Sequence, residues 1–498
     1  MPILPLSRAL AYQAARKPQD AIAIEYGDDR LTFRELDARS NARARAFQDA
    51  GVRPDDLVAI VLPNSSLFLE TAFAIWKCGA MPTNIAAGLP AEELRGIVEV
   101  ARPRLVVGGD ADCLGGAATH IGAEFEPHGY STAELPELNP THWKATTSGG
   151  STGRPKVIVI HKPPYFSTEL PPYTNGLRPD GAMLAPAALS HGAPFSFCVF
   201  SLVMGKRVVG MKRFDAREAL GLIERERLDW AYLVPTMIHR IWTLPPEERD
   251  AFDLSSLEGL IHTGMKIAPW LKEAWINYIG PEKVWEIYGG SEGHGSCVIR
   301  GDEWLAHRGS VGRPGAGSKT RIVGEGGRDC APGEVGEIYF LPAAGAGTTY
   351  HYIGAEPRRI EGGWESIGDL GWLDEDGYLY LADRRHDLIV RAGANIYPAE
   401  VEAALESHPG VACAIVVGLP DEALGQRVHA VIEASEGVDH ADLARSLPVH
   451  IAQKLSRFKC PTSYEITDQR LRDDAGKARR SAIRDGAIAR AADAVESR

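Results

Sequence analysis

The chain has 498 residues, of which 44% are hydrophobic and 24% are charged, and its 54 basic and 66 acidic side chains give a formal net charge of −12. This is the composition of a globular protein, and it excludes a disordered, collagen-like or disulfide-scaffold chain. A net acidic protein has no general attraction for nucleic acid or for an anionic membrane, so any phosphate that it binds needs a local site. At roughly 150 residues per domain, the length predicts about three folding units.

The cysteines and the apolar segments indicate where the protein works. Seven cysteines are scattered without a CxxC pair, which argues against zinc and redox motifs and favours free thiols in a reducing cytosol. The N-terminal segment lacks the apolar core of a signal peptide, and no apolar run approaches the about 18 residues that cross a bilayer. We therefore expect a cytoplasmic protein with neither a membrane nor a nucleic acid as partner.

Helical and strand-like patterns alternate over residues 1–140. They predict helices over 35–50 and 66–80, and short buried strands over 56–63 and 104–109. The alternation resumes with a strand over 207–211, a helix over 215–227 and a strand over 229–235. Strands that alternate with helices predict an α/β protein with doubly wound sheets.

The pattern changes twice in the second half of the chain. Short β-runs between glycine-rich turns over residues 309–382 predict a small β-barrel. After Asp383 the patterns indicate a helix over 398–410, strands over 413–420 and 429–435, and a helix over 439–455. The C-terminal part is therefore expected to be a separate α+β domain.

A segment rich in glycine and hydroxyl groups runs from Thr146 to Lys156 with the letters TTSGGSTGRPK. Its glycines let the backbone turn tightly and point N–H groups inward, while its hydroxyls and its lysine add further donors. Such a loop can hold a polyphosphate, and Pro155 distinguishes it from a Walker loop. By composition alone, a flexible surface loop is an equally good interpretation. The candidate phosphate ligands are Ser148, Gly149, Gly150, Ser151, Thr152, Gly153 and Lys156.

The letters SGGSTGRPK resemble the phosphate-binding signature of the adenylate-forming superfamily, which comprises acyl-CoA synthetases, non-ribosomal adenylation domains and firefly-type luciferases. Further motifs follow in the family's order: YGGSE at 288–292, GDLG at 368–371, DRRHDLI at 383–389, GANIYPAEVE at 393–402 and GK at 476–477. The resemblance implies a large N-terminal domain that binds ATP and the acyl group over 1–383, a hinge over 384–388 and a small mobile α+β lid over 389–498.

Members of this family join a carboxylate to the α-phosphate of ATP and release pyrophosphate. Because two anions must meet, positive charge and hydrogen-bond donors have to gather at that point. The resemblance implies that Glu292 binds Mg²⁺, a hard cation that prefers oxygen ligands. It also implies that Ser291, where the family more often has threonine, contacts the α-phosphate and that the catalytic Lys477 bridges the carboxylate and the α-phosphate.

The nucleoside contacts are likewise implied by the resemblance. Tyr288 is expected to stack on adenine, and Asp369 to accept hydrogen bonds from both ribose hydroxyls. The remaining ATP contacts are expected from Thr263, Gly264, Met265, Gly289 and Arg384. His386 occupies the hinge position that usually holds Asp or Lys. Because histidine changes charge near neutral pH, we hypothesise that rotation of the lid is sensitive to pH.

The stretch 186–195 bears on the substrate acid. It contains no acidic residue, so the ammonium of an amino acid would be desolvated there without a partner, at a cost of several kcal/mol. His191 resembles the gate residue that acyl-CoA synthetases place near the substrate carboxylate.

Four glycines around Glu292 (Gly289, Gly290, Gly293 and Gly295) predict a wide cavity. The expected acyl pocket comprises Ala193, Pro194, Phe195, Val234, Met237, Gly290, Gly293, His294 and Gly295, beside His191 and Met265.

No carrier domain follows within the chain, so coenzyme A is the expected acceptor, with its pantetheine arm passing Gly393. The loop spelling and the segment SHGAPF most resemble bacterial ligases for steroid, bile-acid or terpenoid acids. We therefore predict an acid–CoA ligase for a bulky hydrophobic polycyclic acid, such as a diterpenoid acid of secondary metabolism, with ATP and coenzyme A as co-substrates and Mg²⁺ as cofactor. A homodimer is left open.

Three alternatives remain. The first is an aryl- or fatty-acid–CoA ligase, and the second is a stand-alone adenylation enzyme that loads a carrier protein. The third is an AMP-binding regulatory protein that has lost catalysis. The presence of Glu292, Asp369 and Lys477 argues against the third.

Overall fold

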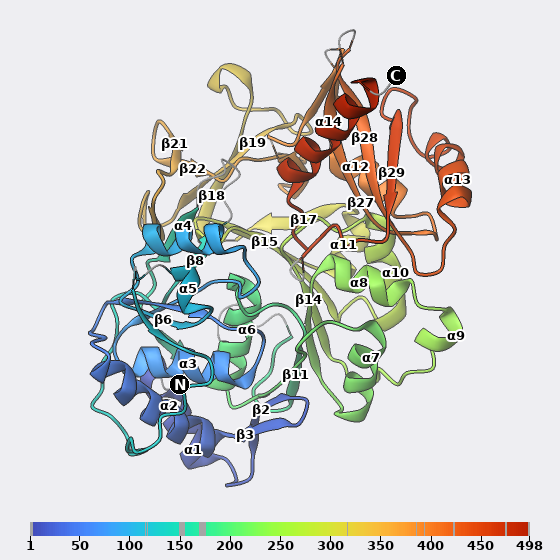
Figure 1. The fold of residues 1–498 in the computed structure, drawn as a ribbon. Coiled ribbons are helices and arrows are strands. Elements are labelled where there is room, and N and C mark those ends of the chain that lie inside the picture. The colour runs from blue at the N-terminus through green and yellow to red at the C-terminus, as the bar shows by residue number, and fades with distance from the viewer. Residues whose placement is uncertain are drawn as a thin grey trace.

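The computed structural model describes residues 3–114, 116, 118–148, 155–168, 176–315, 317–384, 386–392, 394–421, 424–473 and 476–496. Two large sheets with helices packed on them form the body of the chain, and the C-terminal part carries a small sheet of its own (Figure 1). The predicted α/β class is confirmed. Among the described residues, no helix has both the length and the apolar character that a membrane span requires.

The first sheet has seven strands in the order β20-β9-β8-β5-β4-β6-β7. Their bounds are Leu57–Val61 for β4, Met81–Asn84 for β5, Leu105–Gly108 for β6, Thr119–Ile121 for β7, Lys144–Ser148 for β8, Lys156–Ile160 for β9 and Tyr350–Ile353 for β20. The connecting helices are α2 (Phe33–Asp49), α3 (Ser66–Lys77), α4 (Ala91–Ala101) and α5 (Ala111–Leu114). Strands β7, β6, β4, β5 and β8 run parallel. The strands and helices predicted over 35–109 are therefore confirmed.

The second sheet begins with the parallel strands β2, β12, β11, β13, β14 and β15, and the antiparallel β3 flanks β2. Their bounds are Ile22–Tyr26 for β2, Asp29–Thr32 for β3, Ala182–Ala185 for β11, Arg207–Gly210 for β12, Trp230–Leu233 for β13, Gly259–His262 for β14 and Val284–Gly289 for β15. The helices of this part are α1 (Leu6–Arg16), α6 (Gly192–Val203), α7 (Ala216–Arg225), α8 (Pro235–Trp242), α9 (Pro246–Arg249), α10 (Pro269–Ile279) and α11 (Gly301–Ala306). The carboxyl ends of β13, β14 and β15 meet at one edge, where α/β sheets commonly bind ligands.

The short strands predicted over 309–382 are present. All of them except β20, which belongs to the first sheet, continue the second sheet instead of standing apart from it. Strand β16 (Ser296–Arg300) precedes this range. The bounds of the strands that continue the second sheet are Ser310–Pro314 for β17, Ser318–Val323 for β18, Gly336–Pro342 for β19, Arg358–Ile360 for β21, Trp364–Ser366 for β22, Asp369–Leu373 for β23 and Leu379–Arg384 for β24. The join forms because β17 pairs with β16 on one side and with β24 on the other. A short pairing of β1 (Ile3–Pro5) with β10 (Tyr165–Ser167) lies apart from both large sheets.

The C-terminal part has its own α+β fold, as the sequence predicts. Its bounds are Ile389–Arg391 for β25, Ala394–Ile396 for β26, Pro398–Leu405 for α12, Val411–Asp421 for β27, Gly425–Ala434 for β28, His440–Ala452 for α13, Ser463–Thr467 for β29 and Arg480–Glu496 for α14. A separate hydrophobic cluster, from Ile389 to Ile466, fills the space between its sheet and helices. Because this core is its own, the part after the hinge packs as a unit.

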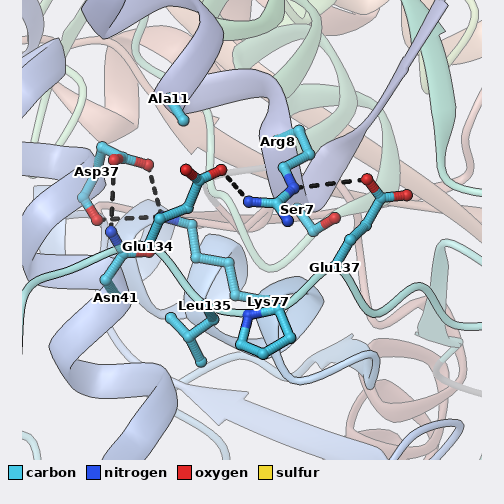
Figure 2. A pocket seen from close by; sticks show the side chains of 10 residues that line it. Ser7, Arg8, Ala11, Asp37, Asn41, Lys77, Glu134, Leu135 and Glu137 are labelled. Carbon is cyan, nitrogen blue, oxygen red and sulfur yellow. Dashed lines mark hydrogen bonds and ion pairs between the residues drawn. The ribbon is translucent and has the colours of Figure 1, made fainter.

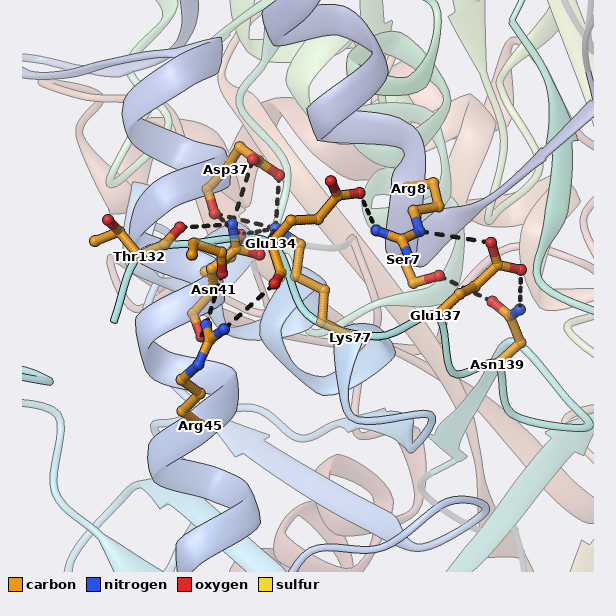
Figure 3. Close-up of polar contacts among 12 residues, drawn as sticks. Ser7, Arg8, Asp37, Asn41, Arg45, Lys77, Thr132, Glu134, Glu137 and Asn139 are labelled. Atoms are coloured by element: carbon orange, nitrogen blue, oxygen red, sulfur yellow. Dashed lines mark hydrogen bonds and ion pairs between the residues drawn. The ribbon is translucent and has the colours of Figure 1, made fainter. Parts of the chain in front are cut away.

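A polar network joins the first helices to the loop over residues 131–139 (Figures 2 and 3). The Lys77 ammonium donates to Asp37 Oδ1 at 2.6 Å and to Asn41 Oδ1 at 2.7 Å, and Arg8 pairs with Glu134 beside them. The cavity between these groups measures about 10 Å³, which is room for one water at most. The network is therefore a structural tie and not a ligand site.

The buried carboxylate of Glu70 on α3 generates a prediction about stability. It accepts hydrogen bonds from Arg39 and Arg43 of α2, each at 2.7 Å. In Glu70→Ala the Arg43 guanidinium would stay buried without a carboxylate to balance its charge, so we expect a loss of about 3–5 kcal/mol, read as a lower urea midpoint. Glu273→Ala removes an exposed partner of Arg308 and should change stability by less than about 1 kcal/mol. Equal midpoints for the two variants would contradict this.

Candidate active site

The loop that carries Lys477 lies against the carboxyl-terminal edge of the second sheet. Gly476 has φ +77°, and a β-carbon on it would lie 2.8 Å from Met265 Sδ and 3.2 Å from Thr236 Oγ1. Met265 follows β14, and Thr236 opens α8 after β13. The Lys477 side chain is exposed, and its backbone N–H donates to Asp473 Oδ1 at 2.8 Å. Two distant motifs of the sequence, at 263–265 and 476–477, are thus in contact.

Tyr288 and Asp369, the two residues expected at the nucleoside, meet in the structure. The Tyr288 hydroxyl at the end of β15 donates to Asp369 Oδ2 at the start of β23, at 2.9 Å. The Tyr288 ring is largely buried and lies 6.3 Å from the Phe340 ring, centroid to centroid. Gly264 follows β14, the strand beside β15. It has φ +94° and no atom within 4 Å of the position of a β-carbon, so its backbone borders open space. Stacking of adenine on Tyr288 stays a prediction.

Glu292, in the loop after β15, contacts side chains of two neighbouring strands of the first sheet. It is 6% exposed, and its Oε1 accepts a hydrogen bond from the Tyr352 hydroxyl of β20 at 2.6 Å. The Lys156 ammonium at the start of β9 lies 3.8 Å from the same oxygen and 3.9 Å from the centre of the Tyr352 ring. Burial and the neighbouring carboxylate raise the pKa of Tyr352 well above its ordinary value, so the hydroxyl keeps its proton.

The donor set around Glu292 fits Mg²⁺. In the part of the chain that the structure describes, no group of three His, Cys, Asp or Glu side chains is arranged to hold a metal ion. A single carboxylate with substrate phosphates and waters is, however, the usual coordination of Mg²⁺ in nucleotide enzymes. Gly290 leaves room for this carboxylate, since a β-carbon there would lie 2.6 Å from Glu292 Oε2.

The start of α6 meets the Ser291 loop. His191 stands at the N-cap position of α6 and is half-buried. A β-carbon on Gly192 would lie 3.3 Å from Ser291 Oγ and 3.6 Å from the ammonium of Lys144. The predicted carboxylate gate and the predicted α-phosphate contact therefore lie on the two sides of one glycine.

The structure corrects part of the reasoning about a wide acyl pocket. A β-carbon on Gly295 would overlap the ring of Phe340, and the space at Gly290 is taken by Glu292, so these glycines permit close packing. At Gly289, the carbonyl of Gly295 lies 3.1 Å from a β-carbon. Gly293, with φ +64°, is the one of the four glycines that borders open space. The cavity expected from four missing side chains is thus supported at one position.

The other expected pocket residues divide by burial. Pro194, Phe195, Val234 and Met237 are buried, and the last three belong to the main hydrophobic core, where Phe195 packs on Phe68 and Trp76. Ala193 is half-buried. His294 is buried against Phe340 and Tyr350, and no described residue is within hydrogen-bond reach of its ring nitrogens. Burial lowers the pKa of His294 and favours the neutral ring.

Charged groups tie the predicted hinge to the C-terminal part. His386 Nε2 lies 3.5 Å from Asp387 Oδ1, and Asp387 Oδ2 lies 3.3 Å from Arg480 Nε at the start of α14. Just before the hinge, Asp383 Oδ2 accepts a hydrogen bond from the backbone N–H of Ala399 in α12, at 2.8 Å. The predicted hinge residue His386 therefore stands beside a carboxylate that already has a cationic partner.

Several predicted residues cannot be placed. Gly149, Gly150, Ser151, Thr152, Gly153 and Gly393 lie outside the described residues. For Ser148 and Arg384 the structure describes the backbone, where Ser148 pairs with Lys156 and Arg384 pairs with Asp369. Their roles stay predictions.

Sequence reasoning missed three polar residues near these motifs. Tyr352 contacts Glu292, Lys144 contacts the first turn of α6, and Lys266 donates to the backbone carbonyl of Leu381 at 2.7 Å, close to the hinge. None of the three stands inside a motif. The one signal that could have marked Lys144 is that it is the only charged residue of β8, directly ahead of the phosphate loop.

Comparisons with known proteins agree with this arrangement. A family model described as AMP-binding enzyme matches residues 10–352, and the model of its C-terminal domain matches 400–477. The chain is 31% identical over 499 residues to a feruloyl-CoA synthase from an Amycolatopsis species, which covers 94% of this chain and 96% of that protein. It is 30% identical over 488 residues, 91% of each chain, to a fatty acid–[acyl-carrier-protein] ligase, ScoC, from Streptomyces coeruleorubidus.

A solved structure has the same fold. The o-succinylbenzoate CoA synthetase of Bacillus subtilis, in complex with its acyl-adenylate intermediate, superposes with a TM-score of 0.77. It is 25% identical to this chain, and the match covers 97% of this chain and 98% of that one.

The contact between Tyr352 and Glu292 generates a prediction. Tyr352→Phe removes the hydroxyl that orients the carboxylate, and a hydrogen bond to a charged group contributes about 1.5–3 kcal/mol. We expect Mg·ATP to bind about tenfold more weakly in calorimetric titration, because each 1.4 kcal/mol changes an affinity tenfold.

The matched control is Tyr380→Phe. It removes another tyrosine hydroxyl, which donates to Asp374 at 3.1 Å and not to Glu292. It should leave the affinity for Mg·ATP unchanged. Equal affinities in Tyr352→Phe and the wild type would refute the orienting role.

Proposed function

The chain belongs to the AMP-binding enzyme family, and on that premise we propose that it is an ATP-dependent acid–CoA ligase of the AMP-forming type. In the first half-reaction a carboxylate and ATP give an acyl-adenylate and pyrophosphate. In the second, the thiol of coenzyme A attacks the adenylate and gives acyl-CoA and AMP. The observation that carries the proposal is the contact of Gly476 with Met265, because it brings the Lys477 loop to the edge where Tyr288, Asp369 and Glu292 lie.

Each residue of the site would bind a charged group of the substrates or the metal ion. Glu292 would hold Mg²⁺ together with the phosphates, and the bound ion supplies charge neutralisation there. Lys156, beside Glu292, would bind the β- and γ-phosphates with the loop over 148–153. Lys477 would bridge the carboxylate and the α-phosphate, and Ser291 would donate to the α-phosphate. Such donors lower the barrier because they are aimed at developing charge before the reaction begins.

Coenzyme A is the proposed acceptor. Its support is the name of the feruloyl-CoA synthase relative. A second candidate is the loading of a separate carrier protein, which the ligase ScoC favours at nearly the same identity. The site described above is compatible with both, because both thiols attack the same adenylate.

For the acid we propose a bulky hydrophobic polycyclic carboxylic acid of the terpenoid or steroid type. The support is the stretch 186–195, which has no carboxylate to pair with an ammonium, and the open space beside Gly293. An aryl or fatty acid is the alternative, and the names of the relatives favour it. That the protein works in the cytoplasm stays a prediction, and so does its assembly as a homodimer.

The proposal is tested by pyrophosphate release from ATP with a panel of polycyclic, aryl and fatty acids, with coenzyme A or a carrier protein as acceptor. We expect release only with acid, and acyl-CoA by mass spectrometry when coenzyme A is added. Acid-dependent release without any acyl-CoA would favour the carrier-loading candidate. Preference for an aryl or fatty acid would overturn the polycyclic proposal and leave the ligase standing.

The role of Lys477 is tested in each half-reaction. Lys477→Ala should lower adenylate formation by about 10²–10³-fold, because a contact made in the transition state is lost. Thioester formation from a synthetic acyl-adenylate should persist, since the lysine has no carboxylate left to bridge. The control Lys454→Ala removes an exposed lysine after α13 and should change neither step. Equal losses in both half-reactions of Lys477→Ala would assign it another role.

A further inference from the structure

Lys144 is a buried cation on the strand that leads into the phosphate loop. It opens β8, which ends at Ser148, and it is 3% exposed. Its ammonium donates to the carbonyl of Gly192 at 2.8 Å and to Ser196 Oγ at 2.6 Å, both in the first turn of α6. It also lies 4.4 Å from the centre of the Trp143 ring. The side chain thus crosses from the first sheet to the helix that begins after His191.

This cation has no carboxylate partner in the part of the chain that the structure describes. Three other buried lysines do have one: Lys77 pairs with Asp37, Lys206 with Asp229 and Lys272 with Glu286. The charged group that acts on Lys144 is Lys162, just after β9, and it repels the ammonium. A positive charge near a helix N-terminus also opposes the helix dipole. The site therefore holds positive charge that the fold itself does not neutralise.

The uncompensated charge lies close to the proposed reaction centre. The position of a β-carbon on Gly192 is 3.6 Å from Lys144 Nζ, 3.3 Å from Ser291 Oγ and 3.9 Å from Thr146 Oγ1. Three polar atoms, from β8 and from the loop after β15, thus lie around the position of this β-carbon, next to His191. If Ser291 contacts the α-phosphate, the ammonium stands one glycine away from the point where the acid must arrive.

We propose that Lys144 is a positioning residue for adenylate formation, which holds the first turn of α6 and supplies the positive charge that draws the carboxylate of the acid to Ser291. This inference rests on the proposed function. In the step itself, a carboxylate oxygen forms a bond to the α-phosphorus, and the bond from that phosphorus to the bridging oxygen breaks, with its electron pair leaving on pyrophosphate. Lys144 neither gains nor loses a proton in this exchange.

The protonation of Lys144 is linked to the acid. Burial, with a smaller contribution from Lys162, lowers the pKa of the Lys144 ammonium to about 7. Lys162 is the charged group near the Lys144 ammonium. The groups that face this ammonium from α6 and from the Ser291 loop are hydroxyls and a carbonyl, which are uncharged. An arriving carboxylate favours the charged form. Above a pH of about 7 the ammonium is increasingly neutral in the free enzyme, so the KM for the acid should rise with pH.

The test compares Lys144→Met with the wild type in both half-reactions. In the pyrophosphate-exchange assay we expect the KM for the acid to rise about tenfold or more, as for loss of a hydrogen bond to a charged group. The KM for ATP should change by less than about twofold, and so should thioester formation from a synthetic acyl-adenylate, because neither depends on a free carboxylate. Methionine suits the apolar surroundings of Trp143 and Phe195, so the melting temperature should not fall.

Lys144→Arg supplies a readout that a purely structural role would not change. Arginine stays charged at every pH of the assay, so the KM for the acid should stay flat where that of the wild type rises above a pH of about 7. The matched control is Lys206→Met, which removes a buried lysine before β12, at the amino-terminal edge of the second sheet. It should lower the melting temperature and leave the KM for the acid unchanged.

Two results would overturn the inference, and they differ from failure of the proposed function. The inference would be overturned by an unchanged KM for the acid in Lys144→Met. It would also be overturned by equal losses of that variant in both half-reactions. Absence of acid-dependent pyrophosphate release from the wild type would overturn both this inference and the proposed function. Normal release from the wild type with an unaltered Lys144→Met variant would overturn this inference alone.

Discussion

The arrangement of this protein depends on one electrostatic constraint, the convergence of hydrogen-bond donors and cations at the carboxyl-terminal edge of the second sheet. The chain is acidic overall, with a formal charge of −12, so it has no general attraction for anions and a local site is needed to bind one. At this edge Lys156 lies beside Glu292, Lys144 lies beside Gly192, and the loop of Lys477 reaches Met265. These residues come from both sheets and from the C-terminal part, so the site exists only when the whole chain is folded.

The same edge shows how this fold handles buried charge. Lys272 and Glu286 lie beneath it as a buried pair, and Arg43 and Glu70 form another between α2 and α3. Such pairs are neutral overall, and they rigidify the layers without attracting a ligand. Lys144 differs because its neighbours are a carbonyl, a hydroxyl and aromatic rings. A buried charge that the protein leaves without a counter-charge is available to an anionic substrate.

Much of the fold was predictable from the sequence because its helices and strands follow hydrophobic periodicity closely. Helix α2 begins at Phe33, two residues before the predicted start, since Thr32 and Glu35 form a capping box. What periodicity could not show is how the short strands after β16 pair, because β17 has to contact both β16 and β24, which are far apart in sequence. For the site, a motif can name candidate residues, such as Glu292 and Asp369, whose roles stay predictions. Tyr352 and Lys144 belong to no motif, and their roles depend on contacts across sheets.

Under the proposed function, weak contacts between the C-terminal part and the body would let one site serve both half-reactions. Trp270 Nε1 donates to the carbonyl of Ala403 at 3.3 Å, and His239 Nε2 lies 3.2 Å from the carbonyl of Glu406. Arg479 pairs with Glu93 at 2.9 Å across the same boundary. Single hydrogen bonds and exposed ion pairs of this kind are each weak and are readily exchanged for water. The C-terminal part has a hydrophobic core of its own, so a rotation about the predicted hinge would replace polar contacts while leaving that core intact.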